Sequence, residues 1–384
     1  MVGIQRRMHL HNTHAVSEVF GILLILTLAS TIISVTLFWG AERMTREKET
    51  VSSQSAYNQL VAINQVLEDL PHQGDNSSRI VNFVSDKGYV HVTSTGTRFV
   101  IFYSINRTFW FDVSNLNQTA KKYNSCIFNI SVFNGTIEKI VVTNLHTQLS
   151  EEPTKTLLSG PGIPLKYKFN THMPLTDAVR IDIYNYTNYV LGSGQLDLKG
   201  RIWIFDIGHL SYELPTQQAM EKIFLENGAV ITKDPSTYFV TQDPPFYMGS
   251  NHFIMRAILL QPSSDITAGP GGSYKFIITL KNLSVRENEF TMKTFSIWTL
   301  DEYGNWYYKP IDIPSRLTDY NFNIQVFGDK ASAWKYYLNS TFTWKPLASE
   351  QTLFWIRSDG TLYTKEFFRV SLRELLYTVR VETG

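Results

Sequence analysis

Three histidines near the start of the chain have a spacing that could hold a metal ion. His9, His11 and His14 form a His-x-His-x-x-His pattern, and imidazole nitrogens are frequent zinc ligands. We interpret them as incidental and predict neither a metal site nor a cofactor. The single cysteine, Cys126, excludes an intramolecular disulfide and a cysteine-based metal cage, and its apolar surroundings predict a small buried residue.

The sequence contains no motif typical of an enzyme. Phosphate-binding Gly-Lys loops, Gly-x-Ser-x-Gly elbows, His-Glu-x-x-His pairs and EF-hand patterns are absent. An anchored hydrolase stays open as an alternative, because the separation of paired carboxylates depends on the fold. The 35 basic and 34 acidic residues give a net charge of +1, which argues against a nucleic-acid partner. We predict a non-enzymatic protein.

Two aromatic clusters could form an adhesive or sugar-binding face. If exposed, their rings could stack on sugars, whereas rings alternating along strands form a core and cross-strand pairs. We favour the second interpretation. The residues are Trp298, Trp306, Tyr307 and Tyr308 in one cluster, and Trp334, Tyr336 and Tyr337 in the other.

An uncharged apolar run stands apart from the rest of the chain. Residues 19–39 read VFGILLILTLASTIISVTLFW, and as a helix they would span about 31 Å, close to the thickness of a bilayer core. The run is too long for the apolar region of a cleaved secretory signal. We predict a cytoplasmic leader at 1–14 and a transmembrane helix at 15–40, with Trp39 as an interfacial anchor.

The orientation in the membrane is predicted from glycosylation sequons. Basic residues alone favour the opposite orientation, because two precede the apolar run and three follow it in the near flank. Eight Asn-x-Ser/Thr sequons, against about four expected by chance, all follow the run. We therefore place the N-terminus inside and the C-terminal domain outside the cell; incidental sequons in a β protein are the alternative. The asparagines are Asn76, Asn106, Asn117, Asn129, Asn134, Asn185, Asn282 and Asn339.

The residues at the start of the apolar run resemble a known family. His14-Ala15-Val16-Ser17-Glu18-Val19-Phe20-Gly21 and the aliphatic run after it are similar to the N-terminal segment of archaeal type IV pilins and archaellin-like surface proteins. The resemblance implies a class III signal cut by a prepilin peptidase, apolar helices bundled in a filament core, and subunit docking through Glu18. A cut before His14 or before Ala15 is implied. The family's basic residue followed by Gly or Ala before the cut is missing here, so an uncleaved anchored relative is the alternative.

A helical stalk is predicted at 41–71. Ala56, Leu60, Ile63, Leu67 and Leu70 are spaced to form one apolar stripe, and proline and glycine residues follow it. The stripe would pack either on the chain's own β domain, which we favour, or on neighbouring copies.

The chain beyond this stalk is predicted to be mainly β, built as antiparallel sandwiches. Short β-branched and aromatic runs recur, and Asn134-Gly135 and Asp359-Gly360 predict two hairpins. A short helix is expected at 215–226. The break at 150–164 predicts a first β domain at 76–155 and a second, larger one at 160–384, with 242–250 as a rival boundary.

These predictions combine into an anchored surface protein. We expect a single-pass cell-membrane protein with a glycosylated β-sandwich ectodomain that acts in filament assembly or adhesion. Its expected partners are the lipid bilayer, pilin-like subunits or copies of itself, and prepilin peptidase. A monomeric anchored module that binds polysaccharide or a transport substrate is the alternative.

Overall fold

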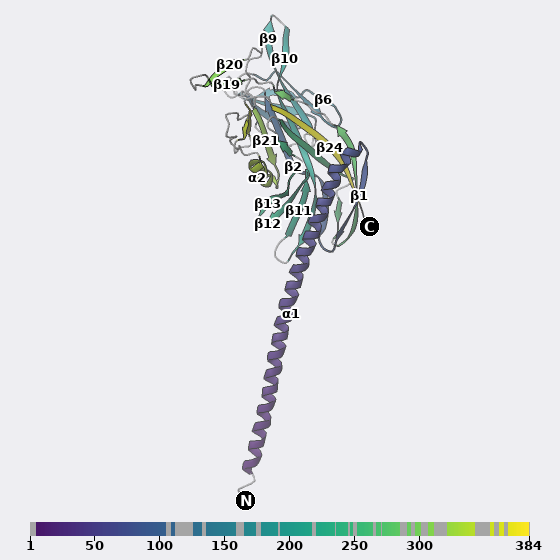
Figure 1. Ribbon diagram of the computed structural model, residues 1–384, viewed down its shortest axis with the longest axis vertical. Helices are drawn as coiled ribbons and strands as arrows, with labels where there is room; N and C mark the ends of the chain where they lie inside the picture. The colour runs from purple at the N-terminus through teal and green to yellow at the C-terminus, as the bar shows by residue number, and fades with distance from the viewer. Residues whose placement is uncertain are drawn as a thin grey trace. The chain divides into compact units, whose positions relative to one another are not determined.

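The computed structural model divides the chain into two compact units, Met1–Ser55 and Ala56–Gly384. It describes residues 5–104, 109–111, 126–132, 136–158, 165–173, 178–190, 193–216, 220–234, 236–244, 246–248, 252–263, 266–269, 271–284, 290–292, 296–300, 306–310, 321–341, 354–356, 361–364 and 368–383. Helix α1 (Gln5–Asp69), which Figure 1 labels, continues into a 3-10 turn, η1 (Leu70–Gln73). Gly74 follows this turn with a φ of +93°. The helix begins ten residues before the predicted start of the transmembrane segment at Ala15.

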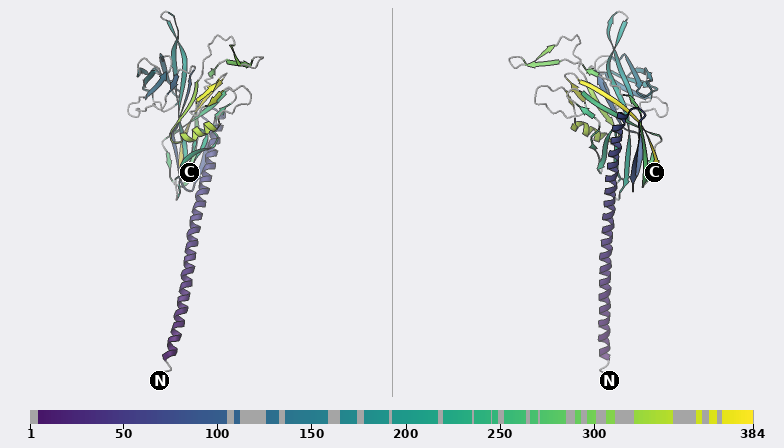
Figure 2. Two further views of the ribbon diagram at one scale, coloured as in Figure 1. Left: turned by 90° about the vertical axis from the view of Figure 1, so that its left-hand side faces the viewer. Right: turned by 45° about the vertical axis from the view of Figure 1, so that its right-hand side comes forward.

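The second unit is β-rich and contains two large sheets, as the sequence predicted. Figure 2 shows these strands from two further sides. The six-stranded sheet has the order β1 (Ser78–Ser85), β17 (Gly272–Ser284), β24 (Phe368–Thr383), β15 (His252–Pro262), β14 (Phe246–Met248), with β18 (Phe290–Met292) on β24. Among the described pairings, only β15 and β24 are parallel.

The twelve-stranded sheet and two smaller sheets complete this unit. The large sheet has the order β13 (Thr237–Gln242), β12 (Ala229–Asp234), β11 (Met220–Glu226), β10 (Ser193–Pro215), β2 (Tyr89–Ser104), β21 (Asn321–Phe327), β23 (Thr361–Thr364), β22 (Phe354–Ile356), extended by β16 (Ile266–Ala268), β9 (Val179–Val190), β5 (Lys139–Asn144) and β6 (Ser150–Glu151). The smaller sheets are β3 (Phe109–Phe111), β4 (Cys126–Val132), β8 (Leu165–Thr171), β7 (Thr154–Leu157), and the pair β19 (Ser296–Leu300) and β20 (Trp306–Pro310).

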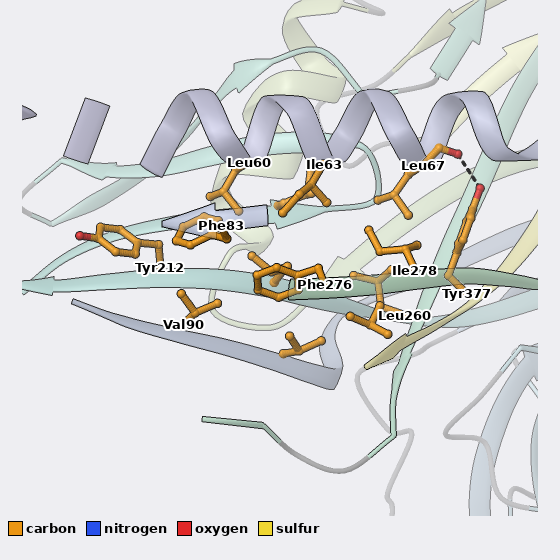
Figure 3. Packing of buried hydrophobic residues seen from close by; sticks show 14 of the residues in the cluster. Leu60, Ile63, Leu67, Phe83, Val90, Tyr212, Leu260, Phe276, Ile278 and Tyr377 are labelled. Carbon is orange, nitrogen blue, oxygen red and sulfur yellow. Dashed lines mark hydrogen bonds between the residues drawn. The ribbon is translucent and has the colours of Figure 1, made fainter. Parts of the chain in front are cut away.

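The apolar stripe of α1 packs on the chain's own β-rich unit, which confirms the favoured interpretation. All five stripe residues are buried in one cluster with side chains from both large sheets (Figure 3). Leu60 and Ile63 lie over Phe83 and Phe276, and the Tyr377 hydroxyl donates a 2.6 Å hydrogen bond to the Leu67 carbonyl. The stripe is therefore part of a hydrophobic core.

The strands do not separate at the predicted domain boundary. β1 and β2, from the predicted domain 76–155, pair with β17, β10 and β21, from the predicted domain 160–384. These strands pair with partners about a hundred or more residues away, which joins the two predicted domains. The division of the structure lies at Ser55/Ala56. The β-rich chain from Ala56 onward is one compact unit.

One of the two predicted hairpins is wrong and the other is confirmed. β22 and β23, on either side of Asp359-Gly360, pair antiparallel. Asn134 and Gly135 lie outside the described residues, but the flanking β4 and β5 belong to different sheets. Apolar side chains of both strands are buried in the same core cluster. β4 and β5 therefore belong to two sheets that share a core and do not pair with each other through backbone hydrogen bonds.

The described part of the predicted helix at 215–226 is strand, not helix. β10 reaches Pro215, and β11 forms a hairpin with β12 through Asn227-Gly228. Neighbouring residues of β11 are buried on opposite faces: Phe224 lies in one core and Ile223 and Leu225 lie in another. A strand covered on both faces loses the polar alternation that identifies strands in a sequence.

The second aromatic cluster lies on a helix that the sequence analysis missed. Helix α2 (Ala331–Thr341) buries Trp334 and Tyr337, which are three residues apart, and leaves Tyr336 70% exposed. The first cluster lies on β19 and β20, where Trp298 is opposite Tyr308 in the register. The side chains of that pair lie outside the described set.

We predict that Gly208→Ala destabilises the β-rich unit by about 1–3 kcal/mol. A methyl group at Gly208, in the bulge of β10, would lie 2.5 Å from the Thr93 carbonyl oxygen and 2.7 Å from that of Leu260, and neither backbone can withdraw easily. Urea unfolding of the full chain in detergent measures the effect. Gly269→Ala is the control, since nothing lies within 4 Å of its added methyl group; equal losses for both variants would contradict the prediction.

Candidate functional site

The most unusual surface among the described residues is the apolar segment of α1. Every side chain at positions 19–40 is exposed, and the segment carries no charge up to Trp39, which is 73% exposed. α1 is the one described helix that is long and apolar enough to cross a membrane. A helix that is hydrophobic all round and exposed to water is unfavourable, so this segment requires an apolar environment.

The three threonine side chains within this segment are satisfied inside the helix. The hydroxyls of Thr27, Thr31 and Thr36 donate to carbonyl oxygens four residues earlier, at 2.5, 2.7 and 2.8 Å. A hydroxyl in hydrocarbon needs a hydrogen-bond partner, and the preceding turn of the helix supplies one. The segment can therefore enter a bilayer without an unsatisfied threonine.

Charged side chains begin directly after the apolar segment. Glu42 pairs with Arg46 at 2.5 Å, and Arg43 pairs with Glu47 at 3.1 Å, each across one helical turn. Such exposed pairs contribute only a few tenths of a kcal/mol, yet they mark where α1 becomes compatible with water.

The predicted docking and processing residues are part of helix α1. Glu18, His14 and Ala15 are helical, as are His9 and His11, and their side chains lie outside the described set. No group of metal-ligating residues is found among the side chains that are described.

The described sequons occupy different environments. Asn76 is exposed in the turn before β1, whereas Asn129 in β4 and Asn185 in β9 are half-buried. Asn282 lies in β17 and Asn339 in α2, with their side chains outside the described set. Asn106, Asn117 and Asn134 lie outside the described residues, and Cys126 is described only as the first residue of β4.

A buried polar cluster, which the sequence analysis did not identify, ties α2 to the twelve-stranded sheet. Glu226 is fully buried; one carboxylate oxygen accepts from the Trp334 indole nitrogen at 2.7 Å, and the other lies 3.0 Å from Lys330 Nζ. His209 Nδ1 lies 3.8 Å from that second oxygen and 3.3 Å from the Thr93 hydroxyl. No sequence signal marks these residues, because they come from separate strands and a helix.

The electrostatics of this cluster follow from its burial. Burial raises the pKa of the Glu226 carboxyl, and the Lys330 ammonium offsets part of that effect. Burial, aided by the positive charge of Lys330, lowers the pKa of His209 to about 3, so its imidazole is neutral near pH 7. Because Glu226 has no exposed surface, the arrangement stabilises the fold and is not positioned to act on a substrate.

Comparison of the chain with protein-family models, curated proteins and solved structures finds no match.

Proposed function

We propose that this chain is an archaeal, pilin-like surface protein anchored in the cell membrane by α1, with its β-rich unit outside the cell and no catalytic role. The exposed, uncharged segment at 19–39 supports this proposal most directly, because only hydrocarbon or other apolar helices can cover it. Copies associate laterally through these helices in filament assembly or adhesion, and Glu18 provides a polar docking contact. A carboxylate next to hydrocarbon needs a partner or the headgroup region.

The anchor and its orientation are tested in cells that express the full chain. We expect the protein to stay in the membrane pellet after carbonate washing, and external protease to digest the β-rich unit in intact cells. N-terminal sequencing of the mature protein then determines whether cleavage occurs before His14 or Ala15. Recovery of the intact chain from the soluble fraction would overturn the proposal.

We expect Glu18→Ala to abolish filaments in sheared cells viewed by negative stain, while membrane insertion is unchanged. Glu42→Ala is the matched control, because this substitution removes one carboxylate from the same helix beyond the apolar segment. The Glu42 carboxylate forms an exposed ion pair with Arg46. Filaments formed by the Glu18 variant would reject the docking role. Absence of filaments from the wild-type protein would favour a monomeric anchored binding module.

A further inference from the structure

Asn76 differs from the other described sequons in its local structure. It is exposed in the turn between η1 and β1 and has a φ of +63°, a left-handed conformation that asparagine tolerates better than most residues. Its backbone N–H donates to the Leu280 carbonyl at 2.8 Å, and Leu280 N–H donates to the Ser77 carbonyl at 3.0 Å. The turn is thus anchored through its backbone while the Asn76 side chain faces solvent.

The other described sequons lie within regular elements. Asn129 is in β4, between β3 and β8, and its amide oxygen is buried. Asn185 is half-buried in β9, opposite Asp197 of β10. A glycan is bulky and hydrophilic and needs open solvent at its attachment point. Of the sequon side chains that the structure describes, only that of Asn76 meets this requirement.

The strand that follows Asn76 lies at the edge of its sheet in the described part of the chain. Within the described residues, β1 is the terminal strand of its sheet and pairs only with β17. Its outer face includes Ile80, which is 64% exposed, and Val84, which is 54% exposed. Exposed apolar edge strands can pair with other chains, and proteins commonly cover or charge them.

One end of this edge is already covered by α1. The Gln59 side chain accepts from Val84 N–H at 2.6 Å and donates to the Val84 carbonyl at 2.9 Å, as a neighbouring strand would. Because the backbone N–H and C=O groups of successive residues point to opposite sides of a strand, those of Ile80 and Asn82 face the same way as those of Val84. Gln59 covers the Val84 end of this edge.

We infer that Asn76 carries an N-linked glycan, and that this glycan covers the remaining edge of β1 and prevents edge-to-edge association of copies. Ile80 is four residues from Asn76, at most about 13 Å for an extended chain, a distance that a short oligosaccharide spans. The glycan and Gln59 then cover the two ends of the same edge. This inference rests on the proposed function, because the β-rich unit must face the glycosylation machinery.

The first test is glycopeptide mass spectrometry of the protein purified from its native cells. We expect sugar on the peptide that contains Asn76, its loss in Asn76→Asp and Ser78→Ala, and its retention in Ser78→Thr. Aspartate also tolerates the left-handed conformation, so Asn76→Asp keeps the turn while removing the sequon. Ser78→Ala removes the sequon without changing Asn76, which guards against a folding defect in the first variant.

The second test is analytical sedimentation of the same variants in detergent. The detergent disrupts contacts between the α1 helices of different copies, so any remaining association comes from the β-rich unit. We expect both unglycosylated variants to form dimers or larger species at concentrations where the wild-type protein is monomeric. Adding Ile80→Lys to Asn76→Asp should restore the monomer, because a charge on an edge strand opposes pairing. Unglycosylated variants that stay monomeric would overturn the shielding role.

The outcomes separate this inference from the proposed function. Sugar on other sequons but not on Asn76 overturns the site assignment and leaves the external location of the β-rich unit intact. Absence of sugar from every sequon overturns the inference, and protease digestion of intact cells then decides independently whether that unit lies outside.

Discussion

Replacing Glu226 by glutamine is expected to lower the free energy of unfolding by about 3–5 kcal/mol. The amide oxygen can still accept from the Trp334 indole, but the negative charge 3.0 Å from Lys330 Nζ is lost. Lys330 is only 4% exposed, so its ammonium would remain buried without a counter-charge. Urea unfolding of the full chain in detergent, followed by tryptophan fluorescence, measures the loss.

A second substitution distinguishes the lost charge pair from a packing defect. Adding Lys330→Met to Glu226→Gln should recover most of the stability, because a neutral pair of similar volume pays no desolvation penalty. Glu213→Gln is the control: its ion pair with Lys222 is partly exposed and should contribute less than about 1 kcal/mol. A loss in Glu226→Gln no larger than in this control would show that the buried pair does not hold α2 in place.

This cluster illustrates which part of the structure could not be predicted from the sequence. Glu226 and Trp334 are 108 residues apart, and neither lies in a motif that indicates a contact. Similarly, Ser78 of β1 meets Thr279 of β17 across 201 residues. Strand pairing of this kind joins residues that are far apart in the sequence, so the spacing of turns and prolines near residue 155 could not show that strands on either side of it pair.

The features that were predicted correctly depend on local periodicity. The apolar run at 19–39 and the stripe of α1 follow from residue type and helical spacing alone. The candidate glycosylation sites show the limit of such patterns. Asn76 and Asn129 have the same sequon, but one lies in an exposed turn and the other within a strand whose partners half-bury it. Only the fold distinguishes these two asparagines.

The stripe leads to the second large effect: Leu60→Ala should cost about 2–5 kcal/mol of stability. Leu60 has no exposed surface, and truncating it leaves a cavity between α1 and the sheet residues that surround it (Figure 3). Val51→Ala is the matched control, because Val51 lies on the same helix and is 68% exposed, so its loss should stay below about 0.5 kcal/mol.

Protein concentration decides whether this stripe belongs to the chain's own core. Because Leu60 packs within the unit Ala56–Gly384, the stability lost in Leu60→Ala should be the same at low and high protein concentration in detergent. A stripe that packed against a neighbouring copy would instead give a loss that grows with concentration, since only the associated state would bury Leu60. A concentration-dependent loss would therefore show that the stripe packs at an interface between copies. The apolar segment at 19–39 would then be the remaining evidence for the anchor.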